Sequence, residues 1–487
     1  MITERKDVAT KERPLCSDCV GESFLREKIR ARGAAGVCFY CYGEDRLTFS
    51  IEQLADEIEH ALEEHYYRTS TEPSGYEYMR INEFGDDWER KGYPIADVIA
   101  DCAEITADSA EDIRSVLFDR HDDFELATMG EENPFDEEAQ YEETEDVDDA
   151  ESQAGWAHFE KSLKTEGRYF NRSAEATLAS LFEGLAEHKA AEGRPIIVEA
   201  GPAMPMDAVY RARVFQSDEK LEEALKNPIK EVGPPPSLAA ANGRMNAHGI
   251  AVFYGATDPV IALVEVRPPV GSKVVVGKFE LIRVVRLLDI EALQSLYVEG
   301  SIFDRDYLHR LERAKFLRWL SEQMTLPVMP GDEPFGYLAT QAIADFLATE
   351  ASPPLDGILY PSVQGTEAKL NVVLFHKASR VEALKTPEGT EISVYISYPA
   401  DEGDEIDYSV SEEVPAVISS APDTTDPGPV LFIPAGLKAF TPEEYDSRDV
   451  TLKLDVSSLE VHHVTGLTIK TEPHSVSRHR FEKRSDF

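Results

Sequence analysis

Four of the five cysteines in this 487-residue sequence have the spacing of metal ligands. Cys16 and Cys19 form one Cys-x-x-Cys pair, Cys38 and Cys41 form another, and 18 residues separate the two pairs. Two tight turns of this kind can bring four thiolates around one tetrahedral ion. The spacing therefore predicts a closed structural zinc site, with unligated thiols and a redox dithiol as the alternatives.

Two arginines in the middle of the chain are candidates for binding an anion. Arg211 interrupts the apolar run Val209–Val214, and Arg244 lies in a Gly-Arg-Met-Asn turn that ends at Asn246. A guanidinium fork can grip a pyrophosphate or a carboxylate through two parallel hydrogen bonds. Ordinary surface arginines are the alternative. Arg213 shares a strand face with Arg211, and sequence context alone favours Arg211.

Glu265 is the candidate catalytic carboxylate. It lies in an apolar run, and the sequence predicts a strand over Val260–Val266. In a strand, the Glu265 side chain points to the face opposite that of Val264 and Val266. This placement favours a functional site or an ion pair, and a solvated strand face is the alternative.

Tyr254 and Ser362 add hydroxyl groups to this set. Tyr254 ends a predicted strand that begins at Ile250, and Ser362 follows the predicted strand Gly357–Tyr360. Activation of a serine nucleophile needs a neighbouring base, and the only nearby histidines, His248 and His376, fit structural roles. The sequence therefore disfavours a serine hydrolase.

Short β-branched runs must position these side chains. Between residues 195 and 376 they alternate with two helical patterns, at residues 304–323 and 340–347. This order predicts an α+β domain built on a bent or split antiparallel sheet. The predicted strands cover residues 196–198, 209–214, 250–254, 260–266, 273–279, 281–287, 357–360 and 370–375.

The N-terminal part is predicted to be helical. A helix over Ser50–Tyr67 begins with a capping pair, Ser50 and Gln53, and two more helices are predicted over Trp156–Arg172 and Glu175–Ala191. Between them, residues 122–151 hold 15 acidic side chains and no Lys or Arg. This segment is predicted to be a solvated linker, with local docking of Phe124, Phe135 and Tyr141 as the alternative.

Five regions follow from these patterns. The C-terminal one is predicted to be β-rich, with strands at residues 391–398, 430–433 and 451–456. The regions are a cysteine knuckle with helices (1–120), an acidic linker (121–153), a helical continuation of the N-terminal domain (154–194), the domain with the reactive residues (195–376) and a β-rich extension (377–487).

The charge balance limits the possible partners. The formal net charge is −43, from 92 acidic and 49 basic side chains, and such a field repels nucleic acid. The basic run near the C-terminus is interpreted as a solvated tail. We expect no membrane partner and a cytoplasmic location, because the sequence has no run of about 20 apolar residues and no signal peptide. A homo-oligomer stays possible.

As a whole, the region from about Ala208 to His376 resembles the RES domain family, whose name stands for Arg, Glu and Ser. This region is about a third of the chain, and the resemblance rests on the order and spacing of a set of short motifs, called landmarks here. The landmarks are Tyr210-Arg211, Gly243-Arg244-Met245-Asn246, Tyr254, Ala262-x-x-Glu265, Thr340-Gln341, Tyr360-Pro361-Ser362 and Asn371–Phe375. More loosely, the N-terminal part looks like the HEPN-type domain often fused to RES domains, without the ribonuclease motif of active HEPN proteins.

The resemblance implies an ADP-ribosyltransferase-like fold and an enzyme that cleaves NAD at its nicotinamide–ribose bond, as glycohydrolase or phosphorylase. It also implies a toxin or defence effector that pairs with an antitoxin or regulatory protein. By the same resemblance, Arg211 and Arg244 hold the NAD phosphates beside Tyr210 and Asn246, Tyr254 packs on nicotinamide or ribose, Glu265 stabilises the ribosyl cation and Ser362 orients the substrate.

Two features depart from the family pattern. An insertion over Ser301–Pro334 lengthens the path from Glu265 to Ser362, and about 110 residues follow the domain. Either feature could regulate access or bind a partner. A protein ADP-ribosyltransferase and a non-catalytic module that binds NAD or a partner are the alternative functions.

Overall fold

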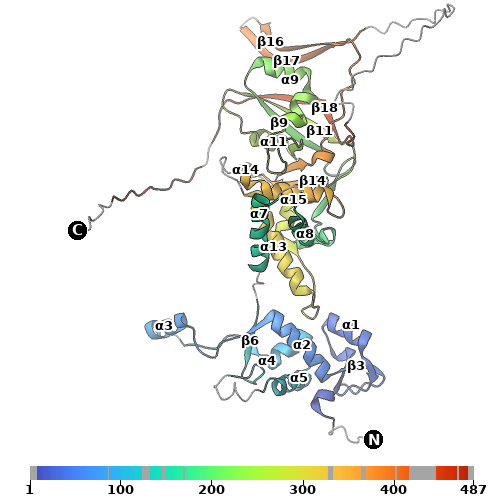
Figure 1. Ribbon diagram of the computed structural model, residues 1–487, viewed down its shortest axis with the longest axis vertical. Coiled ribbons are helices and arrows are strands. Elements are labelled where there is room, and N and C mark those ends of the chain that lie inside the picture. Colours follow the sequence, from blue (N-terminus) through green and yellow to red (C-terminus); the bar gives the residue numbers. More distant parts are fainter. Residues whose placement is uncertain are drawn as a thin grey trace, which may run out of the picture. The chain divides into compact units, whose positions relative to one another are not determined.

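The computed structural model describes residues 8–85, 87–122, 132–144, 150–167, 170–326, 333–362, 369–400, 403–415, 446–468 and 471–480. The chain divides into two compact units. The first unit comprises Met1–His158 and Ser295–Leu320, and the second comprises Phe159–Gln294 and Ser321–Phe487 (Figure 1). Over the described ranges, no helix has the length and apolar character needed to cross a membrane.

Helices form the core of the first unit. They are α1 (Ser23–Arg32), α2 (Ile51–His65), α3 (Gly75–Phe84), α4 (Ile95–Ala103) and α5 (Ala107–Arg120). Ser50 and Gln53 form the capping box at the start of α2, which confirms the predicted helix start. The buried face of α2 includes Leu54, Ile58 and Leu62, spaced as an amphipathic helix requires, and it packs in one core with Ile99 of α4.

Two small sheets complete this unit. One has the order β1 (Pro14–Cys16), β3 (Arg46–Ser50), β2 (Ala34–Gly36), and the other has the order β4 (Tyr66–Arg68), β6 (Gln140–Glu143), β5 (Tyr93–Pro94). Strand β6 lies inside the segment predicted as an acidic linker. Phe135 and Tyr141 are buried in the core, so residues 132–144 follow the docking alternative. Phe124 lies outside the described residues.

The insertion after residue 300 contributes to the first unit. The predicted helix over residues 304–323 is present as α13 (Tyr307–Thr325). Just before it, Phe303 is buried in the same core as α2, and the Tyr307 ring lies 5.8 Å from the ring of His65. The insertion therefore supplies core side chains to a unit formed mainly by the N-terminal 158 residues.

A mixed eight-stranded sheet organises the second unit, and its order is β18-β11-β9-β10-β15-β14-β12-β8. All neighbours are antiparallel except β12 and β14, which are parallel. The strands are β8 (Ile197–Ala200), β9 (Ala208–Phe215), β10 (Phe253–Ala256), β11 (Lys273–Leu281), β12 (Val285–Asp289), β14 (Gly357–Pro361), β15 (Leu370–Leu374) and β18 (Leu452–His463). This arrangement confirms the α+β class.

Helices cover both faces of this sheet. Helices α9 (Asp218–Lys226) and α10 (Pro228–Val232) pack on one face, and α11 (Pro259–Glu265) packs on the other. The second unit also contains α8 (Arg172–Leu181), α12 (Ile290–Gln294), α14 (Glu333–Gly336) and α15 (Leu338–Thr349), and the division between the two units falls inside α7 (Ala150–Thr165). Helix α8, predicted as part of the N-terminal domain, belongs to the second unit. The ring of Phe182, at its end, stacks 6.0 Å from that of Phe346 in α15.

The predicted strand over Val260–Val266 is wrong, because this segment is helix α11. Asp258 caps the helix by accepting a hydrogen bond from the Val260 N–H, and Pro259 occupies the first turn, where its missing N–H costs nothing. Glu265 is the last residue of this helix.

The region after residue 376 is β-rich, as predicted, and one of its strands joins the central sheet. Strands β16 (Glu391–Ala400) and β17 (Gly403–Glu413) form a hairpin, whereas β18 pairs with β11 along its whole length. The predicted strand at residues 430–433 lies outside the described residues.

Candidate functional site

The register of the sheet separates the predicted site residues into two groups. Tyr210, Ala256, Asn371 and Tyr360 are direct cross-strand partners on β9, β10, β15 and β14, so their side chains share one face. We call this the α11 face, because Ile261 of α11 packs against it. The opposite face, which packs against α9, is called the α9 face.

Glu265 lies at the centre of a hydrogen-bonded group on the α11 face. Its Oε1 accepts one hydrogen bond from Ser362 Oγ and one from Asn371 Nδ2, each 2.7 Å long. These residues come from α11, the end of β14 and β15. A carboxylate at a helix C-terminus is disfavoured by the helix dipole, and the two donors offset this effect.

Two tyrosines adjoin this group. Burial, followed by the nearby charge of Glu265, raises the pKa of Tyr360, while Arg244 acts in the opposite direction. Burial likewise raises the pKa of Tyr254 to about 12. Both phenols are therefore neutral hydrogen-bonding groups at physiological pH, and the charges of Glu265 and Arg244 both act on the Tyr360 hydroxyl.

Tyr254 and Asn246 stabilise the turn that carries Arg244. The Tyr254 hydroxyl donates to Asn246 Oδ1 over 2.8 Å and accepts from the Met245 N–H over 3.1 Å. Asn246 is buried, and its Nδ2 donates to three backbone carbonyls, those of Ala241, Ala247 and Ile250. These contacts assign Asn246 and the Tyr254 hydroxyl to the support of the turn.

The family landmarks Thr340 and Gln341 hold the same turn from α15. Thr340 Oγ1 donates to the Arg244 carbonyl over 2.6 Å, and Gln341 Nε2 donates to the carbonyls of Gly243 and Asn246. Residues almost a hundred positions apart thus fix one loop conformation. The Arg244 side chain itself donates to the Met324 carbonyl over 2.6 Å and lies 5.9 Å from the Tyr337 ring.

Arg211 lies on the α9 face, opposite Glu265. Its cross-strand partner is Gly277, and its neighbours on that face include Val209 and Phe279. The guanidinium donates to the carbonyls of Val232 (2.9 Å) and Tyr254 (2.6 Å), and burial lowers its pKa to about 10.

Arg211 therefore bridges strand β9 to backbone that lies beside it. Because β9 and β10 pair at one position only, Tyr210 with Ala256, the bond to the Tyr254 carbonyl closes the gap where these strands separate. Arg213, on the same face, pairs with Glu231 at 3.2 Å.

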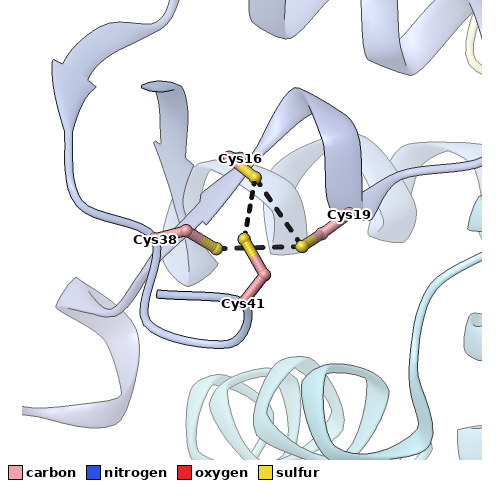
Figure 2. A group of neighbouring side chains, drawn as sticks. All are labelled: Cys16, Cys19, Cys38 and Cys41. Atoms are coloured by element: carbon pink, nitrogen blue, oxygen red, sulfur yellow. Dashed lines mark hydrogen bonds between the residues drawn. The ribbon is translucent and has the colours of Figure 1, made fainter. Parts of the chain in front are cut away.

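The four predicted metal ligands lie together in the first unit (Figure 2). The Sγ atom of Cys16 lies 3.6 Å from those of Cys19 and Cys41, and the Sγ atoms of Cys19 and Cys38 lie 3.9 Å apart. In a zinc tetrahedron with Zn–S bonds of about 2.3 Å, neighbouring sulfurs lie about 3.8 Å apart. The cluster can therefore bind a metal ion, and its geometry fits zinc.

Residues 208–397 match the family model described as the RES domain. This part of the chain is a RES domain, and it includes α11, β14, β15 and the turn with Arg244. In the searches of curated proteins and of solved structures, nothing matches the chain. The resemblance of the N-terminal part to HEPN-type domains stays a prediction.

The structure brings together Glu265, Ser362, Tyr254 and Arg244, with Tyr210 on the same sheet face, but it places Arg211 elsewhere. Sequence reasoning gave no role to Asn371 and Tyr360. Both were landmarks of the family resemblance, and a polar residue before the apolar run Val372–Phe375 was the available signal. A cavity of about 1090 Å³ lies elsewhere in the second unit, and none of these residues lines it.

Proposed function

We propose that this protein is an NAD-consuming enzyme of the cytoplasm, which cleaves the bond between nicotinamide and ribose. The observation that carries the proposal is the contact of Ser362 with Glu265, inside a RES domain and on the sheet face that also holds Tyr360 and Arg244. A RES domain is consistent with an NAD-related enzymatic or toxin function.

Departure of nicotinamide leaves an oxocarbenium-like ribose. A carboxylate near the anomeric carbon stabilises a positive charge that exists only in the transition state, which is the interaction that accelerates a reaction. Glu265 is the residue we assign to this role. Nicotinamide leaves as a neutral molecule, so the reaction needs no general acid.

Arg244 is the group we assign to the diphosphate of NAD. Its carbonyl and its turn are held by Thr340 and Gln341, while one guanidinium nitrogen contacts the Met324 carbonyl. The Tyr254 ring, anchored through its hydroxyl, offers an apolar surface to nicotinamide or ribose. Binding energy from the remote diphosphate can then orient the reacting bond.

We assign zinc to the four-cysteine cluster. Four sulfur ligands leave no open coordination position, so the ion would stabilise the fold of the first unit and take no part in NAD cleavage. We also propose that the protein acts as a toxin or defence effector, held in check by an antitoxin or regulatory protein. Toxicity on expression that Glu265→Gln abolishes would support this role.

Nicotinamide release from NAD tests the enzymatic proposal. The purified parent should release nicotinamide, and Glu265→Gln should lower the rate by about 10² to 10³-fold, since it removes the negative charge while keeping the shape. Glu199→Gln, a change of an exposed carboxylate on β8, is the matched control and should keep the parental rate.

The product identifies the acceptor. Free ADP-ribose indicates water, a phosphorylated ADP-ribose formed only in phosphate buffer indicates a phosphorylase, and label retained on a macromolecule indicates an ADP-ribosyltransferase. If NAD stays intact at high enzyme concentration and fails to raise the melting temperature, both the enzymatic proposal and the alternative of an NAD-binding module are wrong.

A further inference from the structure

Asn371 is a polar residue in a position where the sheet favours an apolar one. It lies on β15, the strand between β10 and β14, and only 2% of its surface is exposed. The three residues that follow it in the strand, Val372, Val373 and Leu374, are fully buried. A buried amide in such a position carries a free-energy cost unless all of its polar atoms find partners.

Only one of the two polar atoms of the Asn371 side chain has a hydrogen-bond partner among the described residues. Nδ2 donates to Glu265 Oε1 over 2.7 Å, whereas Oδ1 is buried without a hydrogen-bond partner in the part of the chain that the structure describes. The chain therefore keeps a side chain that packing alone does not explain. What this side chain achieves is its contact with Glu265.

Ser362 and Asn371 both donate to the same oxygen of Glu265. Oε1 thus takes two hydrogen bonds, and Oε2 takes none within the described residues. Two donors on one oxygen fix the rotation of the carboxylate and leave the second oxygen available to a substrate. An amide nitrogen donates only, so the contact with Asn371 requires an acceptor oxygen on Glu265.

We propose that Asn371 is a positioning residue, which acts through Glu265 and directs Oε2 toward the ribose of the substrate. This inference rests on the proposed function for the identity of the substrate, but the coupling between Asn371 and Glu265 can be tested without NAD. Asn371 lies within β15, which is paired on both sides, whereas Ser362 follows the last residue of β14.

Steady-state kinetics of nicotinamide release form the first test. Asn371→Ala should lower kcat by about 10- to 100-fold and change KM by less than about twofold, because the lost interaction acts on the transition state. Val372→Ala is the matched control, since it removes an equally buried side chain from the same strand on the opposite face. It should keep the parental kcat. Unchanged kcat in Asn371→Ala would overturn the proposal.

Thermal unfolding as a function of pH is the second test, and it needs no substrate. Asn371→Asp places a second carboxyl group 2.7 Å from Glu265, and the pair must share a proton. The pKa of the new group is then raised in the folded state, so stability is retained at low pH and lost as pH rises through that pKa. Tyr360 and Tyr254, the tyrosines adjoining this pair, stay neutral between pH 5 and 8.

We expect the melting temperature of Asn371→Asp to fall from pH 5 to pH 8 relative to that of Asn371→Ala. Adding Glu265→Gln should abolish this pH dependence, because the new amide can donate to the aspartate. If the two single variants have parallel profiles, the coupling does not exist and the inference is wrong. If the coupling is present but the parent releases no nicotinamide, the proposed function fails while the contact stands.

Discussion

Arg211 and Glu265 lie on opposite faces of the same eight-stranded sheet. The sheet backbone separates them, and the Arg211 guanidinium is already bonded to two carbonyls. In the proposed function, a substrate held at Glu265 would therefore meet Arg244 on its own face. Arg211, the arginine that the family resemblance assigns to the NAD phosphates, is placed to hold strands together.

Arg211→Met should destabilise the protein and leave NAD binding nearly unchanged. It removes the donors to the carbonyls of Val232 and Tyr254, at a cost of roughly 2 to 3 kcal/mol in the free energy of unfolding. Arg244→Met should leave the stability nearly unchanged and raise KM for NAD by at least about tenfold. Denaturant unfolding and steady-state kinetics on the two variants check this. A raised KM for Arg211→Met without lost stability would restore the phosphate role.

Gly243→Ala should distort the turn that presents Arg244. A Cβ at this position would lie 2.4 Å from Asn246 Oδ1 and 2.6 Å from the Tyr254 hydroxyl, which already bond to each other. We expect kcat/KM to fall by at least about tenfold and the stability to fall by roughly 1 to 3 kcal/mol. Gly155→Ala, in α7, meets no atom within 4 Å and serves as the control. Equal behaviour of the two variants would contradict this account of the turn.

Metal removal should unfold the first unit selectively. Metal analysis of the purified protein should find one zinc ion per chain, and a strong chelator should lower the melting temperature of this unit. Cys16→Ser should lose the ion, whereas Cys102→Ser, whose thiol bonds to the Ile99 carbonyl, should retain it. The assignment fails if the parent carries no metal and the chelator has no effect.

Asp446 should stabilise the segment that precedes β18, and this stabilisation should depend on pH. Its hydrogen bond from Arg448 lowers the pKa of Asp446 from 3.8 to about 2. A carboxyl group with a depressed folded-state pKa stabilises the fold above its unfolded pKa and loses this effect as pH falls through the folded one. The contribution, on the order of 2 kcal/mol, should be constant above about pH 5 and decline from about pH 4 to pH 2.

Urea unfolding of the parent and of Asp446→Asn at several pH values measures this contribution as a difference, which cancels the titration of the other carboxylates. The difference should shrink on acidification. If it keeps its size down to pH 3, the ion pair with Arg448 is not the source of the stability.

The sequence was sufficient where local patterns decide the structure. The capping pair at Ser50 and Gln53 and the Cys-x-x-Cys pairs each act over a few residues, and the structure has both as expected. The predicted strand around Glu265 was wrong, because an apolar run of seven residues is compatible with a buried strand and with a short helix equally well. Asp258-Pro259 was the helix-start signal that could have decided it.

Long-range relations were out of reach of the sequence. Strand alternation correctly puts Arg211 and Arg213 on one face, but which face meets Glu265 depends on the pairing of β9 with β10 and β11. The convergence of Ser362 and Asn371 on one oxygen likewise depends on the register of β14 against β15. Neither relation leaves a periodic trace in the sequence.

Strand β18 lies more than fifty residues beyond the end of the family match, yet it pairs with β11 from Leu281 to Lys273. A fragment trimmed to residues 208–397 would leave β11 as an open edge, with unpaired N–H and C=O groups that invite association with other chains. The region that the family model matches and the sheet that it contributes to thus have different boundaries in this protein. A fragment meant to carry the proposed NAD cleavage should therefore extend to His463, the last residue of β18.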